Sequence, residues 1–410
     1  MAAQRDFPTA IDLCSGCGAA SFGLQCVGYN VRAAFEIDPA ARYTYQVHVG
    51  DHDDMAVYNH DITDVRPEMV TQIDGAEDLD LLFAGPPCQP FSDCQGETLE
   101  TDDRMFVAFA VPKWVDALQP KAAVIENVGG LKRNHPRAHQ KLLDDLEDAG
   151  YYVQTIELNA ADYRVPQKRS RVFIIGIRDD LSPPDTWKPP AVRTEDPDQL
   201  SLDSFFANET GLRGYRTASE ALDDLPRPLP AQKPKNDPVH RVSPYDTNRV
   251  TPHSCGTWLN EDQYHGDPDE PGPEFQGGSV LDGKAILMPP NHVEVAHADD
   301  YREKKSELPL GFPGQPTTDR RLHPDRAAPT MTVSSGKPPF HYVGKAPGNN
   351  EPVELVRRLT VREVARLQTF EDHWCFAGTK EEQFRQVGNA VPPLLAEHLG
   401  HHLREQVLEK

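Results

Sequence analysis

Residues 12–24 read DLCSGCGAASFGL, and this stretch decides the fold class. The apolar residues 7–13 have the composition of a buried strand, and a helical stretch follows. Gly16 and Gly18 fall in the turn between the two, where glycine lets the backbone approach a ligand closely. Glu36 closes a second apolar stretch about 20 residues on, where an acid commonly binds ribose hydroxyls. The pattern favours a nucleoside cofactor; the alternative is a tight turn without a ligand.

Strand and helix signals continue to alternate through the first 180 residues. Further apolar stretches lie at 33–37, 79–84, 122–126 and 171–177, and a helical stretch at 138–149. Gly150, directly after that helical stretch, is suited to a helix C-cap. The alternation predicts an α/β fold with a doubly wound, Rossmann-like parallel sheet.

The composition of the chain changes after residue 180. Residues 181–345 are rich in proline and charge with little periodicity, so we expect a smaller, loop-rich insertion. Order returns with Thr360-Val-Arg-Glu363, a capping box that predicts a helix start. Pro392-Pro393 predicts the start of a last helix. Residues 1–180 and 346–410 are therefore expected to form one discontinuous domain.

The charge of the chain is strongly acidic. There are 64 Asp and Glu against 42 Lys and Arg, a net charge of −22. Alone, this argues against nucleic acid as a partner, because phosphate binders carry excess Lys and Arg. The acidic residues are spread along the chain, however, which suits a protein hydrated in very high salt. We therefore hypothesise a halophilic, archaeal source and look at local charge for partners.

The seven cysteines favour reduced thiols over a disulfide framework, since no secretion signal precedes them. Cys14-x-x-Cys17 could be half of a zinc or redox site. No second pair completes it, so buried thiols are the favoured interpretation and no metal is expected. No apolar stretch is long enough to cross a bilayer, which predicts a cytoplasmic protein.

Residues 85–92, GPPCQPFS, place Cys88 among prolines just past the strand expected at 79–84. Ligands of open α/β sheets bind at that edge, and a nucleophilic cysteine needs such an exposed, polar setting. Glu126 ends the strand expected at 122–126 on the same edge, where a carboxylate could protonate or hold a polar ring.

Basic residues gather locally in this acidic chain. Gln167, Arg169 and Arg171 alternate, so a strand would place these donors on one face, suited to phosphate or a polar base. Together with other basic residues they predict a phosphate track. Its members are Lys132, Arg133, Arg137, Lys168, Arg169, Arg171, Arg357, Arg358, Arg362 and Arg366.

Taken in order, these stretches resemble the DNA cytosine-5 methyltransferase family. The resemblance is carried by DLCSGCGAASFGL, FEIDP, HDI, GPPCQPFS, ENV, QKRSR, RLTVREVARLQTF and QVGNAVPP. It implies a catalytic methyltransferase domain at 1–180 and 346–410, and a target-recognition region at 181–345. It also implies S-adenosylmethionine as cofactor and double-stranded DNA as substrate. The flipped-out cytosine would be methylated at carbon 5 while Cys88 is bonded to carbon 6.

The resemblance also implies roles for individual residues. The catalytic residues would be Cys88, Glu126, Arg169 and Arg171. The cofactor-binding residues would be Asp12, Cys14, Gly16, Gly18, Glu36, Ile37, Asp61, Ile62, Pro86, Asn389 and Ala390. The substrate-binding residues would be Gln89, Ser92, Asn127 and Gln167. The chain departs from the family at Cys14, where an aromatic residue is common; Phe22 or Phe35 could compensate.

Two other functions compete with this one. One branch of the family methylates transfer RNA and carries a CFT triplet in its variable region. This chain has only Cys375-Phe376-Ala377, outside that region, so RNA ranks below DNA. A non-catalytic DNA-binding relative is disfavoured by the intact Cys88 and Glu126. We expect a nucleoid-associated monomer, and a cognate restriction endonuclease stays an open question.

Overall fold

The computed structural model describes most of the chain in separate ranges. These are residues 7–50, 55–72, 78–91, 104–192, 214–225, 280–281, 284–285, 320–331, 340–342 and 357–409. The chain divides into two compact units. The first comprises Met1–Arg164, Arg169–Thr194 and Val391–Lys410, and the second Val165–Lys168 and Glu195–Ala390.

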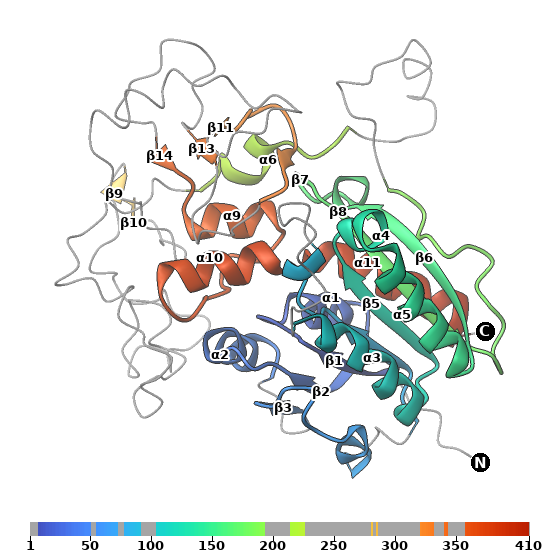
Figure 1. Ribbon diagram of the computed structural model, residues 1–410. Helices are drawn as coiled ribbons and strands as arrows, with labels where there is room; N and C mark the ends of the chain where they lie inside the picture. Colours follow the sequence, from blue (N-terminus) through green and yellow to red (C-terminus); the bar gives the residue numbers. More distant parts are fainter. Residues whose placement is uncertain are drawn as a thin grey trace, which may run out of the picture. The chain divides into compact units, whose positions relative to one another are not determined.

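One seven-stranded sheet organises the first unit (Figure 1). Its order is β3-β2-β1-β4-β5-β8-β6. The strands are β1 (Thr9–Leu13), β2 (Asn30–Phe35), β3 (Ala56–Tyr58), β4 (Leu81–Ala84), β5 (Ala122–Asn127), β6 (Tyr151–Asn159) and β8 (Ser170–Arg178). Every residue of β1, β4 and β5 is buried, as expected for strands covered on both faces. The predicted α/β sheet is confirmed.

The direction of the last strand was predicted wrongly. β8 pairs antiparallel with both β5 and β6, whereas the other neighbouring strands pair in parallel. β6 was not predicted from the sequence, because its residues alternate between buried and exposed at the sheet edge. Because β6 precedes β8 and only about ten residues join them, the chain turns back directly instead of crossing over.

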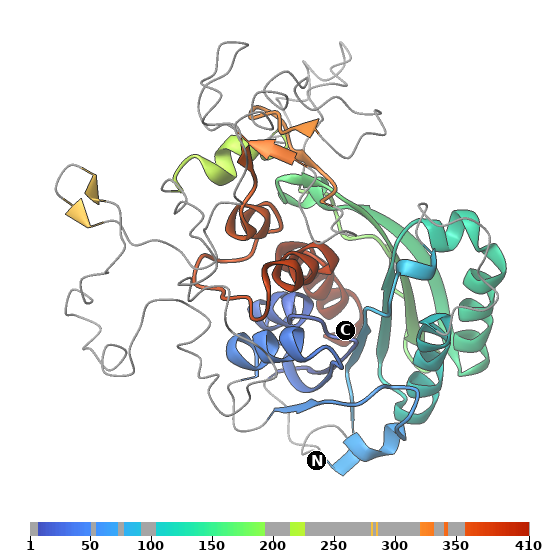
Figure 2. The same cartoon turned by 60° about the vertical axis from the view of Figure 1, so that its left-hand side comes forward.

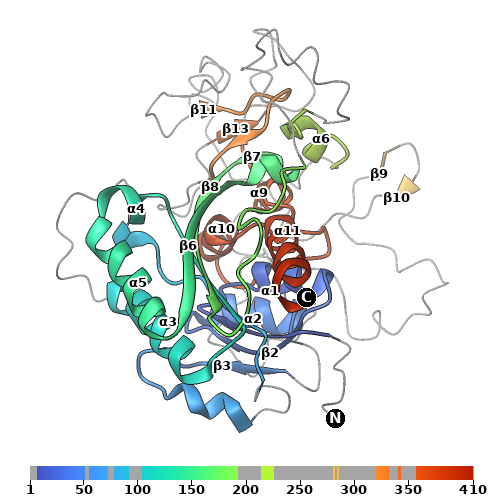
Figure 3. The ribbon, with the colours of Figure 1, turned by 90° about the vertical axis from the view of Figure 1, so that its right-hand side faces the viewer.

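Helices cover both faces of this sheet. On one face lie α1 (Ala19–Cys26), α2 (Pro39–His48) and α11 (Pro393–Leu403). On the other lie α3 (Arg104–Leu118), α4 (Gly130–Asn134) and α5 (Pro136–Asp148), as Figure 3 shows. Figure 2 shows α1 and α2 together in blue on their side of the sheet. The strand order reverses between β1 and β4, which marks the switch point where ligands of such sheets bind.

The end of the chain, from Val391, belongs to the first unit, and its last helix begins where Pro392-Pro393 predicted it. α11 begins at Pro393 and packs closely along α1, where a Cβ on Gly23 would come within 2.2 Å of the Pro393 carbonyl oxygen. The hydroxyl of Tyr29 donates to the carbonyl of Gly400 at 3.0 Å. This glycine contact and this hydrogen bond fix the last helix on the sheet domain.

The second unit contains short elements in its described residues. They are β7 (Gln167–Lys168), α6 (Ala218–Leu222), β9 (Val280–Leu281), β10 (Lys284–Ala285), β11 (Arg320–Arg321), β12 (Ala328–Pro329), β13 (Phe340–Tyr342), β14 (Arg357–Arg358), α9 (Val361–Leu367) and α10 (Lys380–Asn389). The predicted capping box begins α9, with the Thr360 N–H donating to Glu363 at 2.7 Å.

The compact units do not follow the boundaries expected at residues 180 and 345. α9 packs against α6 and α10, and β7 pairs with β12, so residues up to Ala390 group with the second unit. The assignment of target recognition to 181–345 stays a prediction. None of the helices in the described ranges is long and apolar enough to cross a membrane.

Candidate active site

Backbone hydrogen bonds join the turns that follow β1, β2 and β4. The Gly85 N–H donates to the carbonyl of Leu13 at 3.0 Å, and the Ser15 N–H to that of Phe35 at 3.0 Å. These bonds place the three turns side by side at the switch point. The sequence positions the site at this edge because each turn directly follows a buried strand.

The glycine-rich turn after β1 is held by Glu36. The Gly16 N–H donates to one carboxylate oxygen of Glu36, and the Asp38 N–H to the other, both at 2.7 Å. Burial raises the pKa of Glu36, and these two backbone hydrogen bonds lower it. Each carboxylate oxygen retains acceptor capacity, so Glu36 can also accept from a ligand hydroxyl.

The two glycines of this turn have different surroundings. Gly16 has φ +57°, and a Cβ there would meet nothing within 4 Å. Gly18 has φ +92°, and a Cβ there would meet Val49 Cγ2 at 2.7 Å and the Tyr45 ring at 3.0 Å. The turn therefore packs on α2 at Gly18 and faces open space at Gly16. That open space lies next to Glu36 and the 58% exposed Ile37, and the predicted nucleoside cofactor there stays a prediction.

Alanine substitutions at Gly16 and Gly18 should have different effects on stability and on ligand binding. Gly18→Ala is expected to destabilise the protein by about 2–4 kcal/mol, because the clash adds to the left-handed strain. Gly16→Ala should cost about 1–2 kcal/mol from strain alone, yet weaken binding of the predicted cofactor strongly by filling the open space. Urea unfolding and calorimetric titration measure the two effects. Equal destabilisation by both variants would contradict this account.

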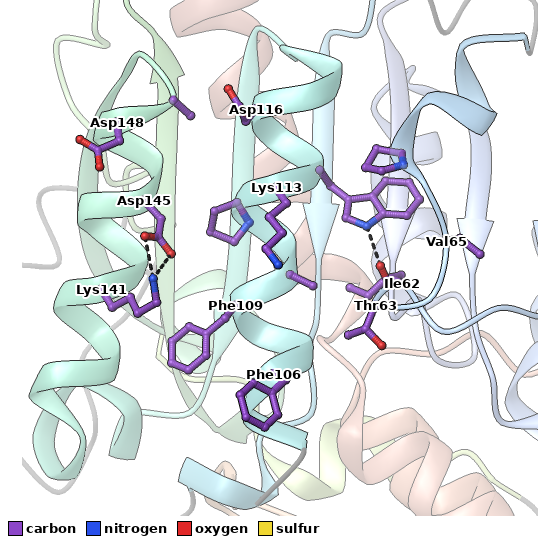
Figure 4. A pocket seen from close by; sticks show the side chains of 15 residues that line it. Ile62, Thr63, Val65, Phe106, Phe109, Lys113, Asp116, Lys141, Asp145 and Asp148 are labelled. Atoms are coloured by element: carbon purple, nitrogen blue, oxygen red, sulfur yellow. Dashed lines mark hydrogen bonds and ion pairs between the residues drawn. The ribbon is translucent and has the colours of Figure 1, made fainter. Parts of the chain in front are cut away.

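Asp61 and Ile62 follow β3. The Asp61 carboxylate accepts from the N–H and hydroxyl of Thr63 at 2.9 and 2.7 Å, which forms a local turn. Ile62 is buried in the core, and its carbonyl accepts from the Trp114 indole at 2.9 Å. Ile62 also lines a cavity of about 750 Å³ that extends along α3, with α5 on one side of that helix and Ile62 on the other (Figure 4). This cavity does not include Cys88.

Cys14 departs from the family pattern, and Phe35 does not compensate for it. Phe35 is buried in β2 and stacks on Tyr58 with ring centroids 4.8 Å apart. Phe22 is half-buried on α1, and its compensating role stays a prediction. Burial, followed by Glu36 and other nearby carboxylates, raises the pKa of the Cys14 thiol. Cys14 is thus a neutral, half-buried group in the turn.

Cys88 follows β4 in a rigid frame. Pro86 and Pro90 are buried, and Gln89 begins a 3₁₀ turn, Gln89–Phe91, whose Phe91 N–H donates to the Cys88 carbonyl at 3.0 Å. The thiol is half-buried. Burial raises the pKa of Cys88, Glu126 raises it further, and Arg171 and Arg169 lower it. The two predicted catalytic elements, thiol and carboxylate, are thus close enough to interact.

Glu126 at the end of β5 pairs with Arg171 on β8. The Glu126 Oε1 and Arg171 Nε atoms are 2.9 Å apart, and the two side chains are only 8% and 12% exposed. Burial raises the pKa of Glu126, whereas Arg171 and Arg169 lower it. Arg169 is fully buried, and burial and Arg171 lower its pKa. A thiol, a carboxyl group and two guanidinium groups therefore form one cluster.

Asn127 is the next residue along β5 and is 1% exposed. Its side-chain oxygen accepts from the Val128 N–H at 2.9 Å. Its Nδ2 atom has no hydrogen-bond partner among the described residues, which leaves a buried donor available beside Glu126. This is consistent with the predicted contact between Asn127 and the substrate, which stays a prediction.

Four predicted site residues are not among the described residues of the first unit. Gln167, Asn389 and Ala390 belong to the second unit, and Ser92 lies outside the described residues. The buried Gln167 side chain accepts from the Met331 N–H at 3.2 Å within that unit. The predicted roles of these four residues in the site stay predictions. No cluster of three or more His, Cys, Asp or Glu side chains able to hold a metal occurs in the described ranges.

Three arginines of the predicted phosphate track, near the start of and within α9, are paired within the second unit, and the buried Arg362 cannot contact a phosphate. Arg357 pairs with Glu363 at 2.6 Å, and Arg362 is fully buried and donates to the carbonyl of Glu371 at 2.8 Å. Arg366 pairs with two aspartates of its own unit. These arginines stabilise the second unit. In the first unit, the exposed members of the predicted track are Lys132, Arg133 and Arg137.

Two buried residues that were not predicted from the sequence connect to Asp12 through hydrogen bonds. The Asp12 carboxylate accepts from the Ser21 hydroxyl at 2.5 Å, which accepts from the Tyr45 hydroxyl at 2.8 Å. Burial raises the pKa of Asp12 to about 7, the Ser21 hydrogen bond lowers it, and Glu36 raises it. Neither Ser21 nor Tyr45 has a motif signal, because only the packing of α1 and α2 brings them to β1.

Known proteins resemble the chain over almost its whole length. The family model of C-5 cytosine-specific DNA methylases matches residues 9–405. The chain belongs to this family. Among curated members, the Type II methyltransferase M.DdeI of Desulfomicrobium norvegicum is 29% identical over 96% of this chain and 88% of its own. M.NgoFVII of Neisseria gonorrhoeae is 29% identical over 94% and 83%.

A solved structure supports the fold of this family member. A prophage-encoded DNA modification methyltransferase of E. coli aligns with a TM-score of 0.66. The alignment covers 98% of this chain and 100% of that protein at 23% identity. At this identity the likeness concerns the fold alone, and it agrees with the Rossmann-like sheet described above.

Proposed function

We propose that this protein transfers a methyl group from S-adenosylmethionine to carbon 5 of a flipped-out cytosine within a specific DNA sequence. The observation that carries the proposal is the cluster at the ends of β4, β5 and β8. It combines the half-buried Cys88 thiol with the buried Glu126–Arg171 pair. Membership of the C-5 cytosine-specific DNA methylase family supports the same reaction.

Carbon 5 of cytosine is a weak nucleophile, and Cys88 is placed to change that. The Cys88 sulfur loses its proton to solvent and bonds to carbon 6, which moves electron density to carbon 5. Glu126 holds or protonates the N3 edge of the ring, where negative charge develops. Loss of the carbon-5 proton after methylation restores the double bond and expels Cys88. Arg171 orients Glu126, and Arg169 helps to hold the base.

The resting pKa values suit these roles. The raised pKa of Cys88 keeps the thiol protonated until the substrate is in place. The raised pKa of Glu126 brings its protonated form closer to neutral pH, where it can donate to the ring. The prolines around Cys88 aim the sulfur, so geometry contributes more than acidity to its reactivity.

The cofactor would be held by the turns after β1, β2 and β3. S-adenosylmethionine supplies, when bound, a methyl group made electrophilic by its sulfonium. Glu36 would accept from the ribose hydroxyls, and the open space at Gly16 would admit the methionine end. Ile37, Asp61 and Ile62 would line the adenine.

DNA would be bound partly through the exposed basic residues that follow β5. Replacing Lys132, Arg133 and Arg137 together with glutamine should make the negative slope of log affinity against log salt shallower by up to about 3. This is expected because each phosphate contact releases counterions. Fluorescence anisotropy on duplex DNA at several salt concentrations measures the slope. As a control, replacement of the exposed Arg66 and Lys113 with glutamine should leave the slope unchanged. An unchanged slope in the triple variant would disprove that Lys132, Arg133 and Arg137 contact phosphates.

Two alternatives remain distinguishable by the substrate. A transfer RNA methyltransferase would use the same catalytic cluster, but the Type II DNA methyltransferases among the relatives favour DNA. A non-catalytic relative is disfavoured by the assembled cluster. We also propose a monomeric, nucleoid-associated enzyme, either the modification half of a restriction–modification pair or an orphan methylase.

The proposal is tested by incubating the protein with duplex DNA and tritiated S-adenosylmethionine from low to molar salt. Label at carbon 5 of cytosine is expected, and bisulfite sequencing of the product would give the recognition sequence. Label in transfer RNA alone, or no label in any substrate, would overturn it. Activity retained at molar salt would support the halophilic hypothesis, whereas inactivation there would contradict it.

A further inference from the structure

The Tyr45–Ser21–Asp12 chain of hydrogen bonds connects three elements behind the glycine-rich turn. Asp12 lies on β1, Ser21 on α1 and Tyr45 on α2. All three side chains are buried, and the two hydrogen bonds measure 2.8 and 2.5 Å. Buried polar groups are held this tightly where they fix a unique local arrangement.

Tyr45 supports the same turn in a second way. Its ring lies against the backbone of Gly18, where a Cβ would come within 3.0 Å of Cδ2. The hydroxyl of this ring is the start of the hydrogen-bond chain. Burial raises the pKa of Tyr45 above its usual range, so Tyr45 stays protonated. Because the Ser21 hydroxyl donates its proton to Asp12, the Tyr45 hydroxyl is the donor toward Ser21.

We propose that Tyr45 and Ser21 are positioning residues of the cofactor site, which hold the Asp12 carboxylate in its charged form at the start of the glycine-rich turn. The inference rests on the proposed function, because it concerns the binding of S-adenosylmethionine. This cofactor carries a positive sulfonium and a positive ammonium, so a buried carboxylate next to its turn favours binding.

The charge of Asp12 is finely balanced. The titratable groups that face it are Tyr45 from α2, Cys14 and Cys17 from the turn, and Glu36 from the end of β2. Glu36 raises the pKa of Asp12 by repulsion, and the Ser21 hydroxyl lowers it by stabilising the carboxylate. The Tyr45 hydroxyl strengthens the Ser21 donor, because hydrogen bonds in a chain polarise one another.

Loss of the Tyr45 hydroxyl should therefore change cofactor binding in a way that depends on pH. In the native protein, affinity should fall as the pH decreases through about 7, where Asp12 takes up a proton. In Tyr45→Phe the same fall should begin about half to one pH unit higher. The two proteins should bind alike at pH above both values, where Asp12 is charged in each, and differ by about two- to threefold in Kd between the values. The difference should grow to about three- to tenfold at pH 6.

The measurement is isothermal titration of S-adenosylmethionine into the native protein and its variants from pH 6 to 8.5. Tyr29→Phe is the matched control, since Tyr29 is equally buried and also donates one hydrogen bond, to Gly400. Tyr29→Phe should bind with the native pH profile. Ser21→Ala tests the chain from a second residue and should shift the profile in the same direction. At saturating cofactor, kcat of Tyr45→Phe should stay within about twofold of native.

Three results would overturn the inference. The first is native binding by both Tyr45→Phe and Ser21→Ala. The second is weakening by the same factor at every pH, which would reflect a general loss of packing. The third is a native protein that does not bind S-adenosylmethionine at all, which would overturn the proposed cofactor as well. The titration of the native protein alone distinguishes this result from the first two.

Discussion

Cys88→Ser is expected to reduce methyl transfer to below about one-thousandth of the native rate. A serine hydroxyl is far less acidic than a thiol, so the oxygen would rarely reach the anionic form that attacks carbon 6. The burial that raises the pKa of Cys88 would disfavour a serine alkoxide even more strongly. Incorporation of tritium from labelled S-adenosylmethionine into duplex DNA measures the rate.

The control for this variant is Cys26→Ser. Cys26 is an exposed thiol at the end of α1, and its replacement should leave the native rate. Cys88→Ser should still bind S-adenosylmethionine and DNA, because the turn at Gly16 and the exposed basic residues are unchanged. A Cys88→Ser variant with more than about a tenth of native activity would rule out the covalent route.

A duplex with 5-fluorocytosine at the target position examines the covalent bond directly. Fluorine at carbon 5 cannot leave as the proton does, so the native enzyme should remain bonded to the DNA. A complex that survives denaturing electrophoresis is expected with the native enzyme and not with Cys88→Ser. A complex formed equally by both proteins would assign the nucleophile to another residue.

Strand ends could be predicted from the sequence because each is a local feature. Gly16 and Cys88 lie in turns that follow short buried strands, and Glu126 lies at the end of one. Burial of such strands requires only apolar composition. The direction of β8 could not be predicted in this way. It depends on β6, whose alternating residues lie at a sheet edge and resemble an ordinary polar segment.

Side chains that act through packing could not be predicted from the sequence. Arg362 was predicted to contact phosphate because arginine is usually exposed. Its position on α9, however, buries it in the interior of the second unit. Ser21 and Tyr45 gave no signal because their hydrogen bonds join two helices and a strand. Motifs identify the residues that face a ligand, whereas the residues that support them depend on helix orientation.

Glu126→Gln is expected to lower the rate of methyl transfer by about 10²- to 10³-fold. Glutamine keeps an oxygen that can accept from Arg171, so the fold should be retained, but it cannot donate a carboxyl proton to the cytosine ring. Single-turnover methylation with saturating cofactor measures the step. Glu157→Gln, on the exposed side of β6, is the matched control and should keep the native rate.

The same variant should make the Cys88 thiol more acidic while the enzyme becomes slower. The negative charge of Glu126 raises the pKa of Cys88, so its removal should move alkylation of Cys88 to lower pH. Arg171→Gln should have the opposite effect, because Arg171 lowers that pKa. Iodoacetamide labelling against pH, followed on the Cys88 peptide by mass spectrometry, reports both shifts. Opposite shifts of the Cys88 pKa in the two variants, together with slower methylation, would show that Glu126 acts on the cytosine ring and not by activating the thiol. Shifts of this pKa in the same direction would refute the arrangement of charges proposed for this site.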